Sequence, residues 1–175
     1  MATKFRMPIK RSPACDPQRY RVYRMEVEAV GARAYARMPR ARVLKLVRSV
    51  CRNYGIPVPL VVWTDKLGRW AAEWSDVGET SRIAFSTKKG MSRDFLTVTH
   101  ELAHHLHHWL DPVTCAAQEA HGPEFMACHM SILDVCRFIP VVGMRAICEK
   151  WKIRYADPGE KCSLADLQRA VGVTP

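Results

Sequence analysis

The sequence lacks the features of a membrane-spanning or exported protein. It contains no run of about 18 apolar residues, the length that a membrane-spanning helix needs. Residues 1–15 have no apolar stretch of the kind found in secretory signals; they are basic, and we interpret them as a flexible arm. The seven cysteines form no CxxC pair. An odd number of thiols without an export signal predicts reduced cysteines and a cytoplasmic protein.

The composition is otherwise that of a soluble globular protein, but its charge is unevenly spread. The chain of 175 residues is long enough for one domain with a proper core, and 48% of it is hydrophobic. Residues 1–56 hold 14 Lys and Arg against three acidic residues, whereas the remainder holds 13 against 14. Such a basic half favours a polyanionic partner, with DNA the first candidate. The alternative is a solvated basic face that keeps the protein soluble.

Hydrophobic periodicity predicts an α+β fold with one domain, residues 16–175, after the arm at 1–15. Its expected parts follow in order: a basic helical part at 16–55, a sheet at 56–90, histidine-rich helices at 91–138 and C-terminal helices at 139–175. Three strands are expected, at 56–64, 69–74 and 81–87. Because short loops join them, with residues 65–68 as a hairpin loop, they predict a small, mostly antiparallel sheet.

Capping and breaking residues predict where the helices begin and end. Asp16 is the expected N-cap of a helix at about 17–37, and Gly55 is expected to close a second at about 40–54. Ser92 is the expected N-cap of a helix at about 93–110. Further helices are expected at about 123–138, 141–153 and 164–171.

Residues 100–104 read H-E-L-A-H, an H-E-x-x-H pattern inside the helix expected at 93–110. His100 and His104 lie on the same helical face, where both imidazoles can bind one metal ion, and Glu101 can reach a water molecule there. The pattern predicts a Zn²⁺ hydrolase with two histidine ligands and Glu101 as the general base. The alternative is a histidine-rich helix that binds no metal. The other histidines of this helix are interpreted as surface or hydrogen-bonding residues: His105, His107 and His108.

A catalytic zinc ion needs a third protein ligand. Downstream candidates are Asp111, Glu119, His121, Glu124 and His129. We favour His121, because Gly122 lets the backbone pass close to the metal-binding helix and Pro123 sets the start of the next one. Glu119 stays open, since two histidines and one glutamate also bind zinc. His129 falls on the buried side of its helix and is expected to be a hydrogen-bonded core residue.

H-E-L-A-H at 100–104 and H-G-P-E-F at 121–125 together resemble the paired motifs of the SprT-like (Spartan-related) metalloproteases, which degrade proteins crosslinked to DNA. The resemblance covers about 57–138. It implies a zincin-like fold, Zn²⁺ binding by His100, His104 and His121, and catalysis by Glu101. The segment D-P-Q-R-Y-R-V-Y-R-M-E at 16–26 is further similar to small, little-characterised metallohydrolases of actinobacteria and their phages. The chain departs from the SprT-like pattern by lacking the CxxC pairs of a C-terminal zinc ribbon.

The expected function is zinc-dependent hydrolysis of peptide bonds, in which Glu101 takes a proton from a zinc-bound water and passes it to the leaving amine. The expected partners are a protein or peptide substrate and DNA on the basic N-terminal half, with no membrane. Two alternatives stay open. One is a DNA-binding protein with a structural or vestigial zinc site, and the other is a metal-dependent hydrolase of a non-peptide amide.

The third strand is expected to bind the substrate, because a strand beside the metal-binding helix can pair with an extended peptide. The residues expected to do so are Ile83, Ala84 and Phe85. No pattern indicates which residue stabilises the oxyanion of the substrate. The available guesses are Tyr155, Arg137 and His108.

Overall fold

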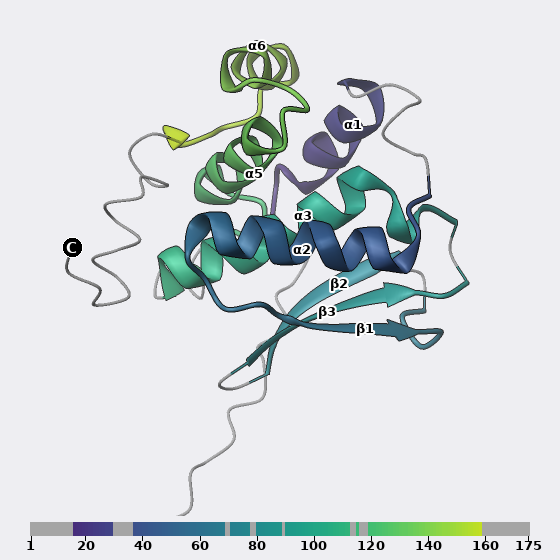
Figure 1. The fold of residues 1–175 in the computed structure, drawn as a ribbon. Helices are drawn as coiled ribbons and strands as arrows, with labels where there is room; N and C mark the ends of the chain where they lie inside the picture. Colours follow the sequence, from purple (N-terminus) through teal and green to yellow (C-terminus); the bar gives the residue numbers. More distant parts are fainter. Residues whose placement is uncertain are drawn as a thin grey trace, which may run out of the picture.

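The computed structural model describes residues 16–29, 37–68, 71–77, 80–88, 90–112, 115 and 119–158, which form an α+β fold (Figure 1). Its α-helices are α1 (Arg19–Ala29), α2 (Arg40–Tyr54), α3 (Phe95–Leu110), α5 (Pro123–Val135) and α6 (Val141–Trp151), and its strands are β1 (Leu60–Thr64), β2 (Ala72–Val77) and β3 (Thr80–Ser86). A short 3₁₀ helix, η3 (Gly90–Arg93), precedes α3. None of the helices in these residues is long and apolar enough to cross a membrane. The arm expected at 1–15 and the helix expected at 164–171 lie outside the described residues.

The sheet has three strands, as predicted, but it is mixed, in the order β1-β3-β2. β2 and β3 pair antiparallel, whereas β1 and β3 pair parallel, with Val62 opposite Ala84. The prediction of a mostly antiparallel sheet is therefore wrong, and residues 65–68 do not close a hairpin between neighbouring strands. The burial of β3 explains the order, because Ile83, Ala84 and Phe85 are at most 1% exposed and such a strand belongs in the centre.

Helix α3 lies at the centre of the molecule. It contacts β2 and β3 on one side, α2 on another and α5 on a third. Figure 1 shows α2 and α3 next to the sheet, with α1, α5 and α6 further from it. Because α3 has neighbours on several sides, its apolar residues Val98, Leu102 and Leu106 are completely buried. The hydrophobic core runs from the sheet through α3 to α5.

The N-cap of α3 is Asp94, so the prediction of Ser92 is wrong. The Asp94 carboxylate accepts a hydrogen bond from the backbone N–H of Thr97 at 2.8 Å, and the helix begins at Phe95. Ser92 lies in η3, and its hydroxyl donates to the carbonyl of Ser86. The 3₁₀ turn includes the predicted cap and the first residue of the predicted helix, so α3 begins two residues later than expected.

The other helix boundaries agree with the prediction to different degrees. α2 spans the predicted residues, and Gly55 ends it in the left-handed conformation with φ of 65°. α5 begins at Pro123 as predicted but ends at Val135, two residues before Arg137 takes a φ of 53°. α6 ends at Trp151. α1 begins at Arg19, and the part of its predicted extension at 30–36 lies outside the described residues.

Segments far apart in the sequence are tied together at the end of the molecule that holds α1. The buried side-chain amide of Gln18 donates to the carbonyl of His121 and to that of Arg154, and its oxygen accepts from the backbone N–H of Arg154. The backbone N–H of Ala156 donates to the carbonyl of Pro123. The start of α5 is thus fixed by residues from both ends of the described chain.

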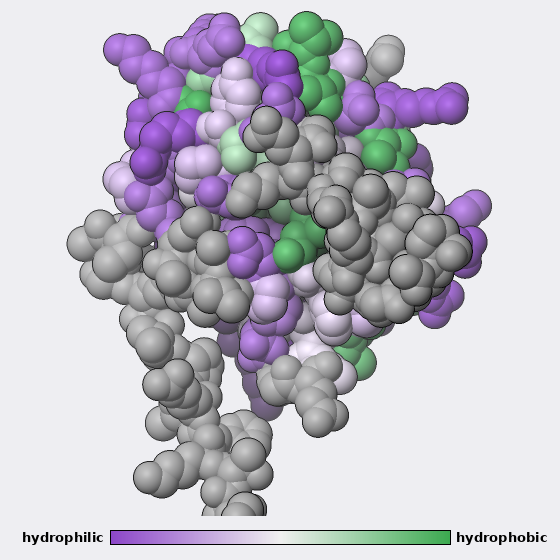
Figure 2. Space-filling view, turned by 90° about the vertical axis from the view of Figure 1, so that its left-hand side faces the viewer, coloured by the Kyte–Doolittle hydropathy of each residue, from purple (hydrophilic) through white to green (hydrophobic). Residues whose placement is uncertain are grey.

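The surface is mainly hydrophilic on the face that Figure 2 shows, where hydrophobic side chains gather toward the top, at the level of α6 and α1. These two helices also carry the most exposed large apolar residues. Val142 of α6 is 74% exposed, and Tyr20 of α1 is 71% exposed. Single exposed apolar residues of this kind are common on folded proteins.

Candidate metal centre

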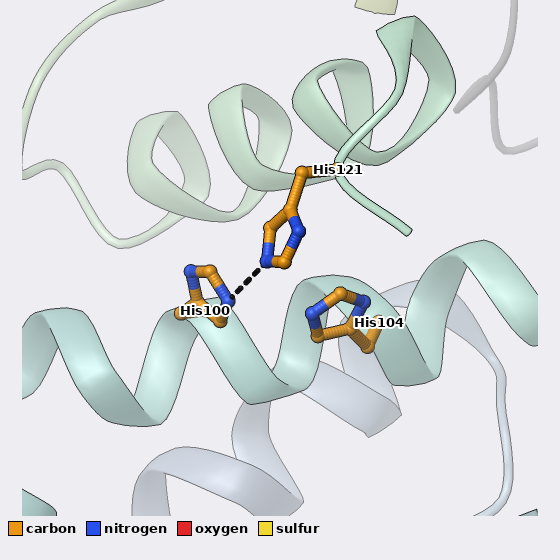
Figure 3. A group of neighbouring side chains, drawn as sticks. All are labelled: His100, His104 and His121. Carbon is orange, nitrogen blue, oxygen red and sulfur yellow. Dashed lines mark hydrogen bonds between the residues drawn. The ribbon is translucent and has the colours of Figure 1, made fainter. Parts of the chain in front are cut away.

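The structure brings three histidines from two segments to one point (Figure 3). His100 and His104 lie one turn apart on α3, and His121 precedes α5 and points down between them. One ring nitrogen of each lies within 4.8 Å of the others, and the Nε2 atoms of His100 and His121 are 3.0 Å apart. His100 and His121 are buried, whereas His104 is half-buried. This group can hold a metal ion.

Local geometry places His121 where it can meet α3. Gly122 is the N-cap of α5 and Pro123 its first residue, so the chain turns sharply after His121. A Cβ atom on Gly122 would come within 3.2 Å of the carbonyl oxygen of Glu119. A side chain at this position would therefore have to displace the Glu119 carbonyl by a few tenths of an ångström. We expected Gly122 to allow a close approach to the metal-binding helix. The atoms nearest to a Cβ at this position belong to Glu119 and Glu124 and not to α3.

Two carboxylates at the N-terminal end of the described chain bind the outer nitrogens of the histidines. Oδ2 of Asp16 lies 2.5 Å from Nδ1 of His121, and Oε1 of Glu26 lies 2.6 Å from Nδ1 of His100. Sequence reasoning missed both, and it assigned Asp16 to a helix cap. A signal was present, because Asp16 and Glu26 are two of only three acidic residues in the strongly basic stretch 1–56.

These hydrogen bonds decide which nitrogens can bind a metal. The ionised forms of Asp16 and Glu26 only accept hydrogen bonds, so with both ionised Nδ1 of His100 and of His121 carries the proton and each Nε2 presents a lone pair. Two lone pairs facing each other at 3.0 Å repel unless a cation lies between them. A tetrahedral zinc ion holds its nitrogen ligands roughly 3.3 Å apart. The donor set and its spacing therefore fit a small divalent metal such as Zn²⁺.

The histidines are uncharged at neutral pH, as metal ligands must be. Burial lowers the pKa of His100 to about 3 and that of His104 well below its ordinary value. Burial also lowers the pKa of His121, although its hydrogen bond to Asp16 opposes this effect. Neutral imidazoles keep their lone pairs available, so no proton has to leave before a metal binds.

Glu101 is buried beside this cluster and is held by the edge strand β2. The backbone N–H of Trp74 donates to its carboxylate. Burial raises the pKa of Glu101 to about 8, and this hydrogen bond lowers it only in part. The indole ring of Trp74 also stacks on His104, with the ring centroids 6.2 Å apart. β2 is therefore the strand that lies against the H-E-x-x-H residues.

Two aromatic rings enclose the three histidines. Phe125 of α5 is fully buried, and its ring centroid lies 4.4–5.0 Å from those of His100, His104 and His121. Tyr23 of α1 lies 5.3 Å from His100 and from His121. Tyr23 falls in the helix expected at about 17–37, and nothing in the sequence pattern indicates that this helix covers a site.

The alternative ligands are engaged elsewhere in the described residues. Glu119 accepts a hydrogen bond from Arg154 at 2.7 Å and does not belong to the histidine group. His129 is completely buried, with Nε2 3.3 Å from the Thr99 hydroxyl and Nδ1 3.5 Å from Glu26. Its place on the buried side of α5 agrees with the interpretation of a core histidine.

The remaining histidines of α3 point to different neighbours. His105 is buried, and its Nε2 bonds the carbonyl of Pro57 at 2.8 Å. His107 is also buried, so neither lies on the surface, and His105 agrees with the other half of the expectation, a hydrogen-bonding residue. His108 is half-buried and packs on Trp74, with the ring centroids 5.3 Å apart.

The strand nominated for substrate binding has no free edge. β3 is paired with β1 along one edge and with β2 along the other, and Ile83 and Phe85 point into the core. Ile83, Ala84 and Phe85 therefore cannot add a peptide strand, and this expectation is corrected. We expected β3 because it is the strand nearest to the metal-binding helix in the sequence. In the sheet, β2 is an outer strand, and it also contacts α3.

Comparisons with models of known protein families, with curated proteins and with solved structures found no match. The site itself combines three neutral histidines, two carboxylates on their outer nitrogens and a buried glutamate. Chemically, such a set can bind a divalent metal and place a proton acceptor beside it.

Proposed function

We propose that the protein is a Zn²⁺-dependent hydrolase that cleaves peptide bonds, with a zincin-like arrangement of α3 and β2. The observation that carries the proposal is the His100, His104 and His121 group with Glu101 buried next to His100. A structural zinc site is normally closed by four protein ligands, whereas this group supplies three and leaves one position open. Three protein ligands and a nearby carboxylate are the composition of a catalytic site.

His100, His104 and His121 would hold the metal through their inward-facing nitrogens, and Asp16 and Glu26 would keep the rings of His121 and His100 in that orientation. Bound zinc supplies a water of lowered pKa and polarises the carbonyl group of a substrate. A cation at the histidines also lowers the pKa of Glu101 by Coulomb attraction, which offsets the effect of burial.

Glu101 is the proton carrier of the proposed reaction. Its carboxylate takes one proton from the attacking water while the new C–O bond forms on the substrate carbon. It then gives this proton to the leaving nitrogen as the C–N bond breaks. Water and amide thus become a carboxylic acid and an amine with no other reactant. The backbone N–H of Trp74 holds the carboxylate in place for both transfers.

We place the substrate along β2. This strand is an outer strand of the described sheet and contacts α3, and its Trp74 reaches Glu101 and His104. An extended peptide that pairs with the outer edge of β2, beside the Trp74 N–H that donates to Glu101, would pass over the metal centre. The backbone hydrogen bonds of such pairing do not depend on side chains, which suits a protease of broad specificity.

The experiment that tests this function uses zinc-loaded protein and an unfolded protein substrate. We expect cleavage by the wild type, none by Glu101→Gln with its metal retained, and loss of both metal and cleavage in His100→Ala. Cleavage at the wild-type rate by Glu101→Gln would contradict the role of Glu101. No cleavage of any protein or peptide would favour a non-peptide amide as the substrate.

A second proposal concerns DNA, and it rests on the exposed face of α2. This helix has no acidic residue, and its exposed positions include Arg40, Arg42, Lys45, Arg48 and Arg52. Basic residues one turn apart form a stripe that can follow a phosphate backbone. We propose that DNA binds there, either to localise the hydrolase or as the main role of the protein. Cleavage assays with and without single- and double-stranded DNA separate the two cases.

A further inference from the structure

The proposed reaction leaves one requirement unassigned, a donor for the negative charge that develops on the carbonyl oxygen. Of the residues considered from the sequence, His108 packs on Trp74 and the Tyr155 hydroxyl lies 3.5 Å from Glu149. Arg137 follows the C-terminal end of α5, about 20 Å of helix away from the end that carries His121. Among the described residues, neither His108 nor Tyr155 packs its ring on His100, His104 or His121.

Tyr23, in contrast, lies beside the histidines. Its ring lies 5.3 Å from both His100 and His121, on the segment that also supplies Asp16 and Glu26. The ring is half-buried, so it forms part of the wall of the site and still borders solvent. The negative charges of Glu101 and Glu26 both raise the pKa of the Tyr23 hydroxyl, although burial is the largest cause. The hydroxyl therefore lies near both carboxylates.

Arg19 fixes the direction of that hydroxyl. Its guanidinium lies against the Tyr23 ring, 5.5 Å from the centroid, and donates a hydrogen bond to the phenol oxygen. A guanidinium can only donate, so the Tyr23 proton must point away from Arg19. The positive charge of Arg19 also lowers the pKa of His100 and of Glu101, so Arg19 lies near the cluster as well.

We propose that Tyr23 is a catalytic residue whose hydroxyl donates a hydrogen bond to the carbonyl oxygen of the scissile peptide, and that Arg19 is the positioning residue that holds this hydroxyl. The inference rests on the proposed hydrolysis. As water adds to the carbonyl carbon, the π electrons of the C=O bond move to the oxygen, and the Tyr23 hydrogen bond strengthens as that charge grows. When the C–N bond breaks, the C=O bond re-forms and the hydrogen bond weakens again. Tyr23 keeps its proton throughout.

The test compares Tyr23→Phe with the wild type and with Tyr20→Phe, a matched control on the same helix whose ring is exposed. Removing one oxyanion donor costs about 10²–10³ in kcat. We expect a loss of this size in Tyr23→Phe, with KM and zinc affinity unchanged, and no effect in Tyr20→Phe. Arg19→Met should lose about tenfold in kcat, because the hydroxyl remains but is no longer held.

Affinity for a phosphinic peptide, a stable mimic of the tetrahedral anion, gives a readout apart from turnover. In Tyr23→Phe its affinity should fall by the same factor as kcat, while zinc affinity, measured by chelator competition, should not change. Unchanged kcat and phosphinate affinity would overturn the proposal, and so would a parallel loss of zinc affinity, which would make Tyr23 a support for the ligands. If the wild type cleaves nothing, the proposed function fails on its own, and an unchanged phosphinate affinity in Tyr23→Phe then overturns this proposal separately.

Discussion

Side chains of the candidate site come from three separate parts of the sequence, and each part has a different task. α3 supplies His100, His104 and Glu101, and the turn before α5 supplies His121. Glu26 of α1 and Asp16, three residues before the start of α1, are the partners of the ligands, across separations of 74 and 105 residues. The histidines that could hold a metal ion and the carboxylates that orient them are thus far apart in the sequence.

Replacing Glu26 should weaken metal binding. Without its carboxylate, the Nδ1 proton of His100 loses its acceptor and the ring is no longer held with Nε2 inward. Loss of such an outer partner typically costs 10–100-fold in metal affinity. We expect about tenfold for Glu26→Gln, whose amide oxygen still accepts, and more for Glu26→Ala. Chelator competition measures this, with exposed Asp134→Asn as the control; equal affinities in all the variants would refute the positioning role.

Phe125 should matter for both stability and the metal site. It is completely buried beneath three histidines, so Phe125→Ala leaves a cavity under them. Truncations of this kind cost about 3–5 kcal/mol. Urea denaturation of the metal-free protein should show this loss, with a smaller one for Phe125→Leu. A cost below about 1 kcal/mol for Phe125→Ala would mean that the ring is not packed as described.

Only the part of this site that depends on local spacing could be predicted from the sequence, and the rest depends on tertiary packing. His100, His104 and Glu101 are neighbours on one helix, so spacing alone places them together. His121 could be favoured from Gly122 and Pro123, which mark a turn. Asp16, Glu26 and Tyr23 meet the histidines only after α1 packs on the rest of the chain, and no local rule specifies that packing.

The secondary-structure elements, too, were only partly predictable from the sequence. α2 could be predicted to its last residue, because Gly55 ends it in a conformation that glycine favours. The order of the strands could not, because pairing depends on which strand is most buried in the assembled core. β3 became the central strand, and β2 the edge strand near Glu101, in a way that loop lengths do not reveal.

The start of α3 gives a prediction at this scale. Asp94 caps the helix that carries the candidate ligands, and loss of an N-cap typically costs about 1 kcal/mol. We expect Asp94→Ala to lower the free energy of unfolding by about this amount. Asp94→Asn should be nearly neutral, because asparagine caps as well as aspartate. If Asp94→Asn costs as much as Asp94→Ala in urea denaturation, the capping role is wrong.

At the scale of the whole molecule, the basic surface and the metal centre belong to different elements. The exposed stripe lies on α2, whereas the histidines lie on α3 and before α5. Both α2 and α5 contact α3, so the arrangement is compact enough for DNA on α2 to bring a protein near the site. The two activities can nevertheless be separated by substitution.

The salt dependence of DNA binding tests the role of the stripe. Each phosphate contact contributes about −0.9 to the slope of log affinity against log salt concentration. Replacing Arg42, Lys45, Arg48 and Arg52 by glutamine should therefore reduce that slope by roughly three to four. The control replaces four other exposed lysines, Lys66, Lys88, Lys150 and Lys152, with the same change in net charge. Equal reductions in both proteins would show that net charge, and not the α2 surface, governs binding.

The central claim is that His100, His104 and His121 form one metal centre, and metal content measured by mass spectrometry tests it most directly. We predict one zinc ion per chain in the wild type and in Glu119→Ala, and none in His121→Ala. A wild-type protein purified in the presence of zinc that retains no metal, or a His121→Ala variant that keeps it, would contradict the claim.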